Sequence, residues 1–394
     1  MNVAVIDADL IGRKNHRFPN LACMKLSGYH KEIGDEVHLL AAYENLASYD
    51  IVYIAKAFTD TYVPEHVLEF PNVTYGGTGF FYDTAPPLPD EIEHHFPDYH
   101  LYDAYLDEYN ITDRKWYTDY SIGYTTRGCI RGCSFCVNKD SRKVVAHSPV
   151  SEFLDESRPK IALLDDNILA FGGWEAVFES LNESGKRFQY RQGMDIRLLT
   201  KKKANVVFNS KYDGRVLFAF DDISDRDIIE ERLRMIRDDI GSLRGIMFFV
   251  LCGYDRDGIY DSDFFIRDIT DTLVRIQILL GYKEVNPYVM LYEKFNTDPL
   301  FSSVYITISR WANMKAFLKV HTLLSFARNQ GEHSKPFANM KKFYDDYPEI
   351  RPLLNEPYHE IQRVRANVDW ESNEGKSPNG EGEEETEQPL KLFY

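Results

Sequence analysis

The sequence has few cysteines, no long apolar run and no excess of positive charge. It holds five cysteines in 394 residues. No apolar stretch approaches the ~20 residues that a membrane-spanning helix needs. The run Val3-Ala4-Val5-Ile6 after Met1 is too short for the apolar region of a secretory signal, and no basic leader precedes it. Without signs of secretion, an odd number of cysteines argues against a disulfide framework. These absences together predict a cytoplasmic protein that does not contact a membrane.

The charge balance argues against a nucleic-acid partner. The net charge is −16, of which the segment 371–389, with seven Glu and one Lys, contributes −6. Proteins that bind nucleic acids usually carry a basic stripe, because neutralising phosphates drives their affinity. The one compact basic run, Lys201-Lys202-Lys203, follows a predicted strand and is better explained as the solvated face of a helix.

Three of the five cysteines stand close together in the sequence. Cys129, Cys133 and Cys136 have the spacing Cys-x3-Cys-x2-Cys. A [4Fe–4S] cluster ordinarily takes four thiolates, so three leave one iron without a protein ligand. Zinc is the alternative, but structural zinc sites usually take four ligands in two separated pairs. The other thiols, Cys23 and Cys252, are isolated in the sequence.

The loop Gly128 to Cys136 resembles the signature of the radical S-adenosylmethionine (radical SAM) enzymes. The resemblance implies that the three cysteines hold a [4Fe–4S] cluster whose bare iron is chelated by the amino and carboxylate groups of S-adenosylmethionine (SAM). It also implies that the ring of Phe135 lies near the adenine, which is compatible with simple core packing. In that superfamily an electron donor such as flavodoxin or ferredoxin reduces the cluster.

Residues 1–85 predict a flavodoxin-like domain. Short apolar runs alternate with helical segments, which favours a parallel sheet covered by helices. The predicted strands are 3–6, 37–40, 51–55 and 73–75. The domain resembles the cobalamin-binding domain that precedes the barrel in many radical SAM enzymes. The Asp-x-His-x-x-Gly motif that supplies the cobalt ligand is absent, so histidine-ligated cobalamin is unsupported. The run Gly76-Gly77-Thr78-Gly79 is interpreted as a tight turn.

The rest of the chain predicts a barrel and a tail. Six apolar runs end in polar or Gly residues and match the partial (β/α)6 barrel, of the TIM type, of the radical SAM family. They are 122–125, 161–164, 189–191, 216–220, 245–251 and 288–291. The predicted organisation is a domain at 1–85, a linker at 86–117, the barrel at 118–330, a helical extension at 331–370 and a disordered acidic tail at 371–394.

The polar residues after each predicted strand are the candidate site, because barrels bind ligands at the carboxyl ends of their strands. Asp165, Asp166 and Asn167 follow the second strand, where the resemblance places acceptors for the SAM amino group; an ordinary solvated turn is the alternative. Arg197 can hold the methionyl carboxylate or form a structural ion pair, and the sequence favours neither. Gly253 lets the backbone approach the adenine or ribose.

The resemblance therefore implies an enzyme that cleaves SAM reductively to a 5′-deoxyadenosyl radical, which abstracts hydrogen from a small-molecule or peptide substrate. The catalytic residues that act on the substrate are not identified. A methylthiotransferase would need three further cysteines in the front domain, which has only Cys23. The alternatives left open are a B12-dependent radical SAM methyltransferase, a non-catalytic iron–sulfur protein and a zinc-stabilised binding module.

Overall fold

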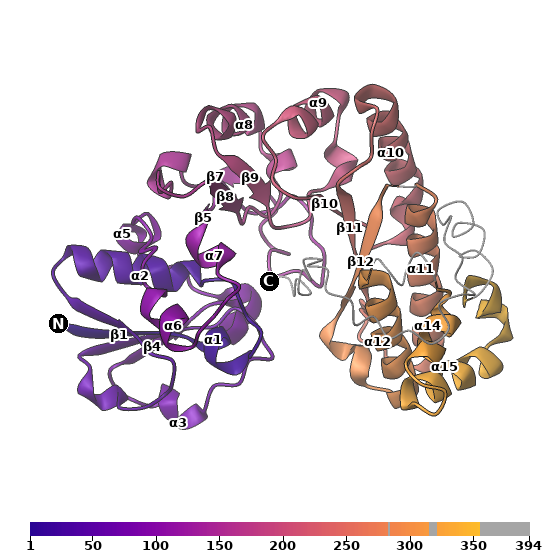
Figure 1. The fold of residues 1–394 in the computed structure, drawn as a ribbon, viewed down its shortest axis with the longest axis horizontal. Helices are drawn as coiled ribbons and strands as arrows, with labels where there is room; N and C mark the ends of the chain where they lie inside the picture. Colours follow the sequence, from indigo (N-terminus) through magenta and orange to yellow (C-terminus); the bar gives the residue numbers. More distant parts are fainter. Residues whose placement is uncertain (283, 315–320, 355–394) are drawn as a thin grey trace. The chain divides into compact units, whose positions relative to one another are not determined.

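The computed structural model describes residues 1–354 except 283 and 315–320. The predicted acidic tail and the end of the predicted helical extension lie outside the described residues. The chain divides into two compact units (Figure 1). Of the described residues, the first unit comprises 1–192 and 209–213, and the second comprises 193–208 and those from 214 to 354. Among the described residues, no helix has the length and apolar character to cross a membrane.

The first unit begins with a four-stranded parallel sheet of order β2-β1-β3-β4. Its strands are β1 (Asn2–Asp7), β2 (Glu36–Leu39), β3 (Ile51–Ala55) and β4 (Val73–Gly76). All four predicted strands are confirmed, and the flavodoxin-like order follows from the way β1 pairs with both β2 and β3. Side chains alternate along β1: Val5 enters one core cluster, whereas Ala4 and Ile6 enter another. Both faces are therefore covered, as in other parallel sheets.

Helices of this unit cover the sheet or follow its strands. Asn20 caps the longest of them, because its side chain accepts hydrogen bonds from the backbone N–H groups of Ala22 and Cys23. The elements up to the second sheet are α1 (Ala8–Gly12), α2 (Leu21–Glu32), η1 (Leu46–Ser48), α3 (Glu65–Leu68), α4 (Thr78–Phe81), η2 (Tyr82–Thr84), α5 (Asp90–Glu93), α6 (Asp103–Glu108) and α7 (Lys115–Thr118).

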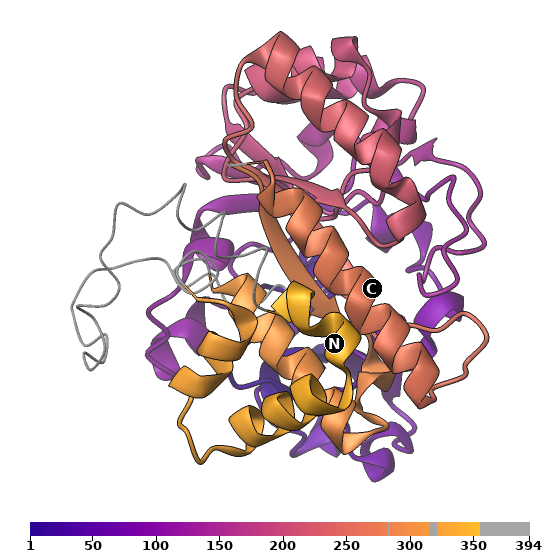
Figure 2. The same ribbon diagram turned by 90° about the vertical axis from the view of Figure 1, so that its right-hand side faces the viewer.

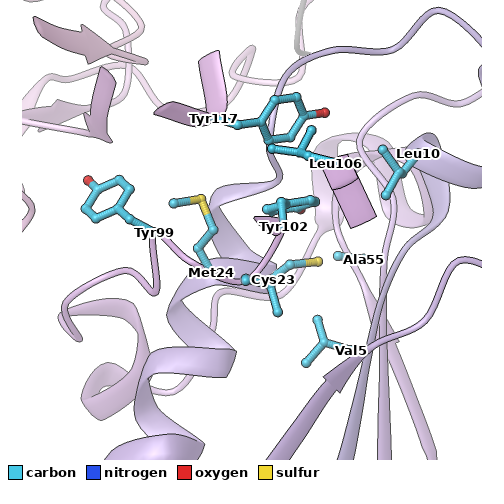
Figure 3. Close-up of a cluster of buried hydrophobic side chains, with 10 residues drawn as sticks. Val5, Leu10, Cys23, Met24, Ala55, Tyr99, Tyr102, Leu106 and Tyr117 are labelled. Atoms are coloured by element: carbon cyan, nitrogen blue, oxygen red, sulfur yellow. The ribbon is translucent and has the colours of Figure 1, made fainter. Parts of the chain in front are cut away.

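The segment predicted as a linker contributes to the core of the first sheet. Tyr99, Tyr102, Leu106 and Tyr117 are buried in the same cluster as Met24 of α2, as Figure 3 shows. The Tyr102 hydroxyl donates a hydrogen bond of 2.9 Å to the buried carboxylate that ends β1. Burial of several aromatic rings contributes about 1.5–3 kcal/mol per large side chain. The segment therefore packs as part of the unit, and the predicted domain bounds stay a prediction.

A second, three-stranded parallel sheet completes the first unit. Its order is β5-β8-β9, and Ile122 pairs with Ala162, which pairs with Gln189. Phe18 and Leu21, from the part of the unit that carries the first sheet, pack against the second sheet in a cluster with Ile122 and Ala162. The elements here are β5 (Tyr120–Gly123), β6 (Thr126–Arg127), β7 (Val145–Ala146), η3 (Val150–Glu152), β8 (Lys160–Leu163), η4 (Ile168–Ala170), α8 (Trp174–Glu183) and β9 (Arg187–Tyr190).

The second unit holds a parallel sheet of order β10-β11-β12. All seven residues of β11 are buried, and α11 packs against this strand (Figure 2). The elements are η5 (Ile196–Leu198), α9 (Lys201–Asn209), β10 (Val216–Ala219), η6 (Ile223–Asp225), α10 (Arg226–Ile240), β11 (Ile246–Cys252), α11 (Ser262–Leu280), β12 (Asn286–Leu291), η7 (Glu293–Asn296), α12 (Pro299–Asn313), α14 (Leu323–Asn329), α15 (Lys335–Asp346) and η8 (Pro348–Ile350).

The six predicted barrel strands are all present as parallel strands. They form two three-stranded sheets, one in each unit, where the sequence predicted a single barrel. Met194, just after β9, makes one isolated parallel bridge to Phe218 of β10. The mixed α/β class with a flavodoxin-like sheet is therefore confirmed, and a continuous (β/α)6 barrel stays a prediction.

Candidate active site

The cysteine loop rises from a short antiparallel ladder. Arg127 pairs with Val145 across β6 and β7, and this pairing closes the base of the loop 128–144. Gly128 opens the loop with a φ of +93°, a conformation that side chains disfavour. A Cβ at Gly128 would also lie 2.4 Å from the carbonyl oxygen of Lys143. Both the conformation and the space at this position therefore require glycine.

The three cysteines of the loop form no disulfide, and each is partly exposed. Two of the sulfurs accept hydrogen bonds from nearby N–H groups. Cys129 Sγ accepts from the backbone N–H of Arg131 and from Asn167 Nδ2, each at 3.4 Å, and Cys136 Sγ accepts from the backbone N–H of Asn138 at 3.4 Å. Burial raises the pKa of the Cys136 thiol to about 12, and the nearby Cys133 thiol acts in the same direction.

The chemistry of this donor set fits a cluster bound through three thiolates. N–H groups aimed at the sulfurs are among the contacts that tune iron–sulfur clusters. In the part of the chain that the structure describes, no three His, Cys, Asp or Glu side chains are grouped as ligands of one metal ion. The three thiolates of a cubane bind three different irons, so a cluster does not need such a grouping.

Asp165 braces the strand end from which the loop starts. Its side chain is buried and accepts four hydrogen bonds, from the backbone N–H and the hydroxyl of Thr125 and of Thr126, at 2.5–3.0 Å. These bonds tie the end of β8 to the residues that follow β5. Because protein donors already use both carboxylate oxygens, the structure shows a bracing role for Asp165. Its predicted contact with SAM stays a prediction.

Asp166 holds the two sides of the cysteine loop together. One oxygen accepts from the backbone N–H of Gly128, before the first cysteine, and the other from Asn138 Nδ2, after the last one, both at 2.7 Å. Burial raises the pKa of Asp166, while these donors and the nearby Arg127 guanidinium act to lower it. The carboxylate therefore acts as a cross-link between the start and the end of the loop.

Asn167 combines a contact to sulfur with an unused acceptor. Its Nδ2 donates to Cys129 Sγ, and its Oδ1 is buried with no hydrogen-bond partner among the described residues. A buried polar atom that stays unpaired costs free energy, so an orphaned acceptor beside a candidate ligand marks a place for a donor.

Residues that follow the first sheet contact the cysteine loop at Phe135 and Lys139. The hydroxyl of Tyr82 donates to the carbonyl oxygen of Phe135, and Asp83 forms an ion pair with Lys139. Tyr82 has a positive φ of +42°, which is rare for a residue with a side chain. The side chain of Phe135 is half-buried, and its predicted place near an adenine stays a prediction.

The remaining predicted residues belong to the second unit. Arg197 forms ion pairs of 2.7 Å with both Asp195 and Asp225, so its guanidinium takes part in a structural pair. Gly253 has a φ of +78°, and its N–H donates to the half-buried Asp268 carboxylate at 2.7 Å. The structure thus brings together the cysteines and the residues Asp165, Asp166 and Asn167 in the first unit, and it places Arg197 and Gly253 in the second.

Comparison with known proteins gives a distant structural likeness. No protein-family model and no curated protein matches this sequence. The solved structure of the cobalamin-dependent SAM radical enzyme OxsB with aqua-cobalamin and SAM bound aligns with 88% of this chain at 13% identity and a TM-score of 0.46. The same enzyme with aqua-cobalamin alone aligns with 78% of the chain at 12% identity and a TM-score of 0.42. The aligned parts cover 61% and 55% of those chains, so this chain spans less than two thirds of their length.

Sequence reasoning did not find several residues that shape this site. Ser141 accepts a hydrogen bond from the backbone N–H of Cys129, and Asn138 reaches Asp166. Both follow the last cysteine within a few residues, but single Ser and Asn residues in a loop carry no pattern. Tyr82 and Asp83 are more than 40 residues before the loop, and no local signal connects them with it.

Proposed function

We propose that this chain is a radical SAM enzyme whose cysteines 129, 133 and 136 hold a [4Fe–4S] cluster. The observation that carries the proposal is the cysteine loop itself, with three thiols outside any disulfide beside the carboxyl ends of β5 and β8. When bound, such a cluster supplies an electron that cleaves SAM to methionine and a 5′-deoxyadenosyl radical, which removes hydrogen from a small-molecule or peptide substrate.

Within this proposal each residue of the first unit has a definite task. Asp166 keeps the loop closed through Gly128 and Asn138. Asn167 orients Cys129 through its Nδ2, and its unpaired Oδ1 accepts a hydrogen bond from the amino group of SAM. An amine that binds iron through its nitrogen still carries N–H groups, and an amide oxygen can accept a hydrogen bond from one of them. Phe135 supplies an apolar surface for the adenine.

The two residues of the second unit have weaker support. A cosubstrate carboxylate at Arg197 would compete with Asp195 and Asp225, which already pair with the guanidinium. Gly253 stays the candidate for a close approach of the backbone to the nucleoside, because its positive φ excludes most side chains.

Cobalamin is the alternative cofactor, and we infer that the first sheet does not fit it. Open α/β sheets bind ligands at the carboxyl ends of their strands, where the strand order reverses, here between β1 and β3. Asp9, after β1, accepts hydrogen bonds from the backbone N–H groups of Ala57 and Phe58 after β3. The loop after β4 packs on the same segment, since the N–H of Gly79 donates to the carbonyl oxygen of Lys56 at 2.9 Å. The protein's own groups occupy this edge.

Anaerobic reconstitution tests the proposal. Wild-type protein should bind about four irons per chain and form 5′-deoxyadenosine from SAM and a reductant. Cys133→Ala should lose both properties, whereas Cys23→Ala should keep them, because Cys23 is buried in the first sheet's core. A Cys133→Ala variant that binds as much iron and cleaves SAM as fast as wild type would refute the proposal. Iron binding without SAM cleavage would instead support the non-catalytic alternative.

A further inference from the structure

Glu93 is the centre of a charged cluster at the base of the cysteine loop. Its carboxylate lies 3.0 Å from Lys25 Nζ, 3.2 Å from His147 Nε2 and 3.5 Å from a terminal guanidinium nitrogen of Arg127. Only 15% of the Glu93 side chain is exposed, and Lys25 is exposed to 6%. Lys25 Nζ also donates to the backbone carbonyl oxygen of Glu93. A single, largely buried carboxylate therefore contacts three basic side chains.

The three partners come from separate elements. Lys25 belongs to α2 of the front region, Arg127 is the second residue of β6, and His147 follows β7 directly. Because β6 and β7 are the two strands that close the cysteine loop, Glu93 contacts the chain on both sides of the loop. Through Lys25, Glu93 also connects β6 and the residue after β7 to α2. No other acidic side chain among the described residues forms an ion pair with both Arg127 and His147.

The balance of charge shows why the carboxylate matters here. Burial acts to raise the pKa of Glu93, but the hydrogen bond with His147 and the Lys25 and Arg127 charges outweigh it and bring the pKa to about 2. Glu93 is therefore an anion at neutral pH. Without it, the buried Lys25 ammonium would lie near the Arg127 guanidinium, whose side chain is 42% exposed, with no counter-charge between them, and a buried charge without a partner is strongly destabilising.

Arg127 connects this cluster electrostatically with the loop. Its guanidinium stacks on the ring of Tyr124 at 3.6 Å, lies 3.5 Å from the Glu93 carboxylate and also interacts electrostatically with Asp166. Asp166 in turn holds Gly128 and Asn138 at the two sides of the loop. Arg127 therefore interacts with both carboxylates, Glu93 and Asp166. A change of charge at Glu93 acts through Arg127 on Asp166, which closes the loop.

His147 gives the cluster a second fixed point. Its ring stacks on His94 with centroids 5.0 Å apart, and its Nδ1 lies 2.9 Å from Ser148 Oγ. His94 Nδ1 in turn lies 2.9 Å from the Glu152 carboxylate. The ring of His147 is thus held from both nitrogens and from one face, so its contact with Glu93 restrains the chain just after β7.

We propose that Glu93 is a positioning residue for the iron–sulfur loop: it fixes both strands at the base of the loop, and its charge contributes to the reduction potential of the bound cluster. This inference rests on the proposed function, since it needs a cluster in the loop. The net charge around a cluster is one of the factors that set its potential. Removal of an anion favours the reduced, more negative cluster, so the potential should rise.

The test compares two substitutions in one helix of the full chain. Glu93→Gln keeps the size and removes the charge, and Glu91→Gln makes the same change at an exposed position of α5. After anaerobic reconstitution, a redox titration followed by EPR measures the midpoint potential. We expect a more positive potential and faster iron loss to a chelator for Glu93→Gln, and wild-type values for Glu91→Gln.

Two further variants separate positioning from simple stability. Lys25→Met removes a cation from the same cluster and should shift the potential in the opposite direction, which also serves if Glu93→Gln does not fold. Glu93→Asp should restore part of the wild-type potential. If Glu93→Gln, or Lys25→Met in its place, lowers only the thermal stability and leaves the potential of the cluster unchanged, the inference is wrong although the proposed function stands. A wild-type chain that binds no cluster overturns the proposed function, and this inference with it.

Discussion

Replacement of Asp166 by Ala should loosen the cysteine loop and speed the loss of iron. The substitution removes two hydrogen bonds of 2.7 Å to a carboxylate, one from the Gly128 N–H and one from Asn138 Nδ2. A hydrogen bond to a charged group contributes about 1.5–3 kcal/mol. Because burial raises the pKa of Asp166, part of this gain offsets desolvation, so the lower end applies. Two such bonds give about 3 kcal/mol, which corresponds to a shift of about 100-fold in the equilibrium between ordered and open loop.

The assay is the rate at which reconstituted protein gives up iron to an excess of chelator without oxygen. If opening of the loop precedes release, Asp166→Ala should lose iron about 100-fold faster than wild type. Asp166→Asn keeps one amide oxygen as an acceptor and should fall between the two. Asp113→Ala, at an exposed position, is the control. Equal release from Asp166→Ala and wild type would refute the assignment of Asp166 as the cross-link of the loop.

Three further predictions concern stability. Burial raises the pKa of Asp7 to about 7, so the folded chain retains a proton that the unfolded chain releases above about pH 4. The free energy of unfolding therefore falls as the pH rises from about 4 to about 7, by up to about 1.4 kcal/mol per pH unit. Asp7→Asn should lack this pH dependence. If urea unfolding gives the same change of free energy with pH for both proteins between pH 5 and 8, the prediction is wrong. Arg158→Met should cost about 3–5 kcal/mol in urea unfolding, because the buried guanidinium donates to three backbone carbonyls; a cost below about 1 kcal/mol would show that these bonds contribute little. Gly123→Ala should cost about 1–3 kcal/mol, since its Cβ would lie 2.3 Å from the Phe153 ring, and an unchanged urea midpoint would mean that the ring moves freely.

The strands could be predicted from the sequence because their signal is local. Ile51 to Ala55 and the run around Val250 are continuous apolar stretches, as parallel strands covered on both faces require. The cysteine loop was equally visible, because three thiols at fixed spacing are a compositional rarity. The fold class therefore followed from patterns that each occupy fewer than about ten residues.

The supporting contacts could not be predicted, because they join residues far apart in the chain. Glu93 reaches Lys25 and His147, which are 68 and 54 residues away from it in sequence. The segment 86–117 was interpreted as a linker from its Pro and acidic content, whereas its tyrosines complete the core of the first sheet. The composition of a segment shows how polar it is. Whether its aromatic rings are buried depends on tertiary contacts with residues far away in the sequence.

The candidate site shows the same division. The position of Asp165, Asp166 and Asn167 after β8 was predicted, but their separate tasks were not. A one-residue step along an extended chain reverses the direction of the side chain, so neighbours in one polar run meet different partners. Asp165 faces Thr125 and Thr126, Asp166 faces the loop, and Asn167 contacts a sulfur.

The EPR spectrum of the reduced, reconstituted protein with and without SAM tests the central claim most directly. A cluster held by Cys129, Cys133 and Cys136 leaves one iron open to the cosubstrate. We therefore predict a [4Fe–4S] signal whose g-values change when SAM is added. A cluster signal that SAM leaves unchanged, or a colourless protein whose loop holds a single zinc ion, would contradict the account.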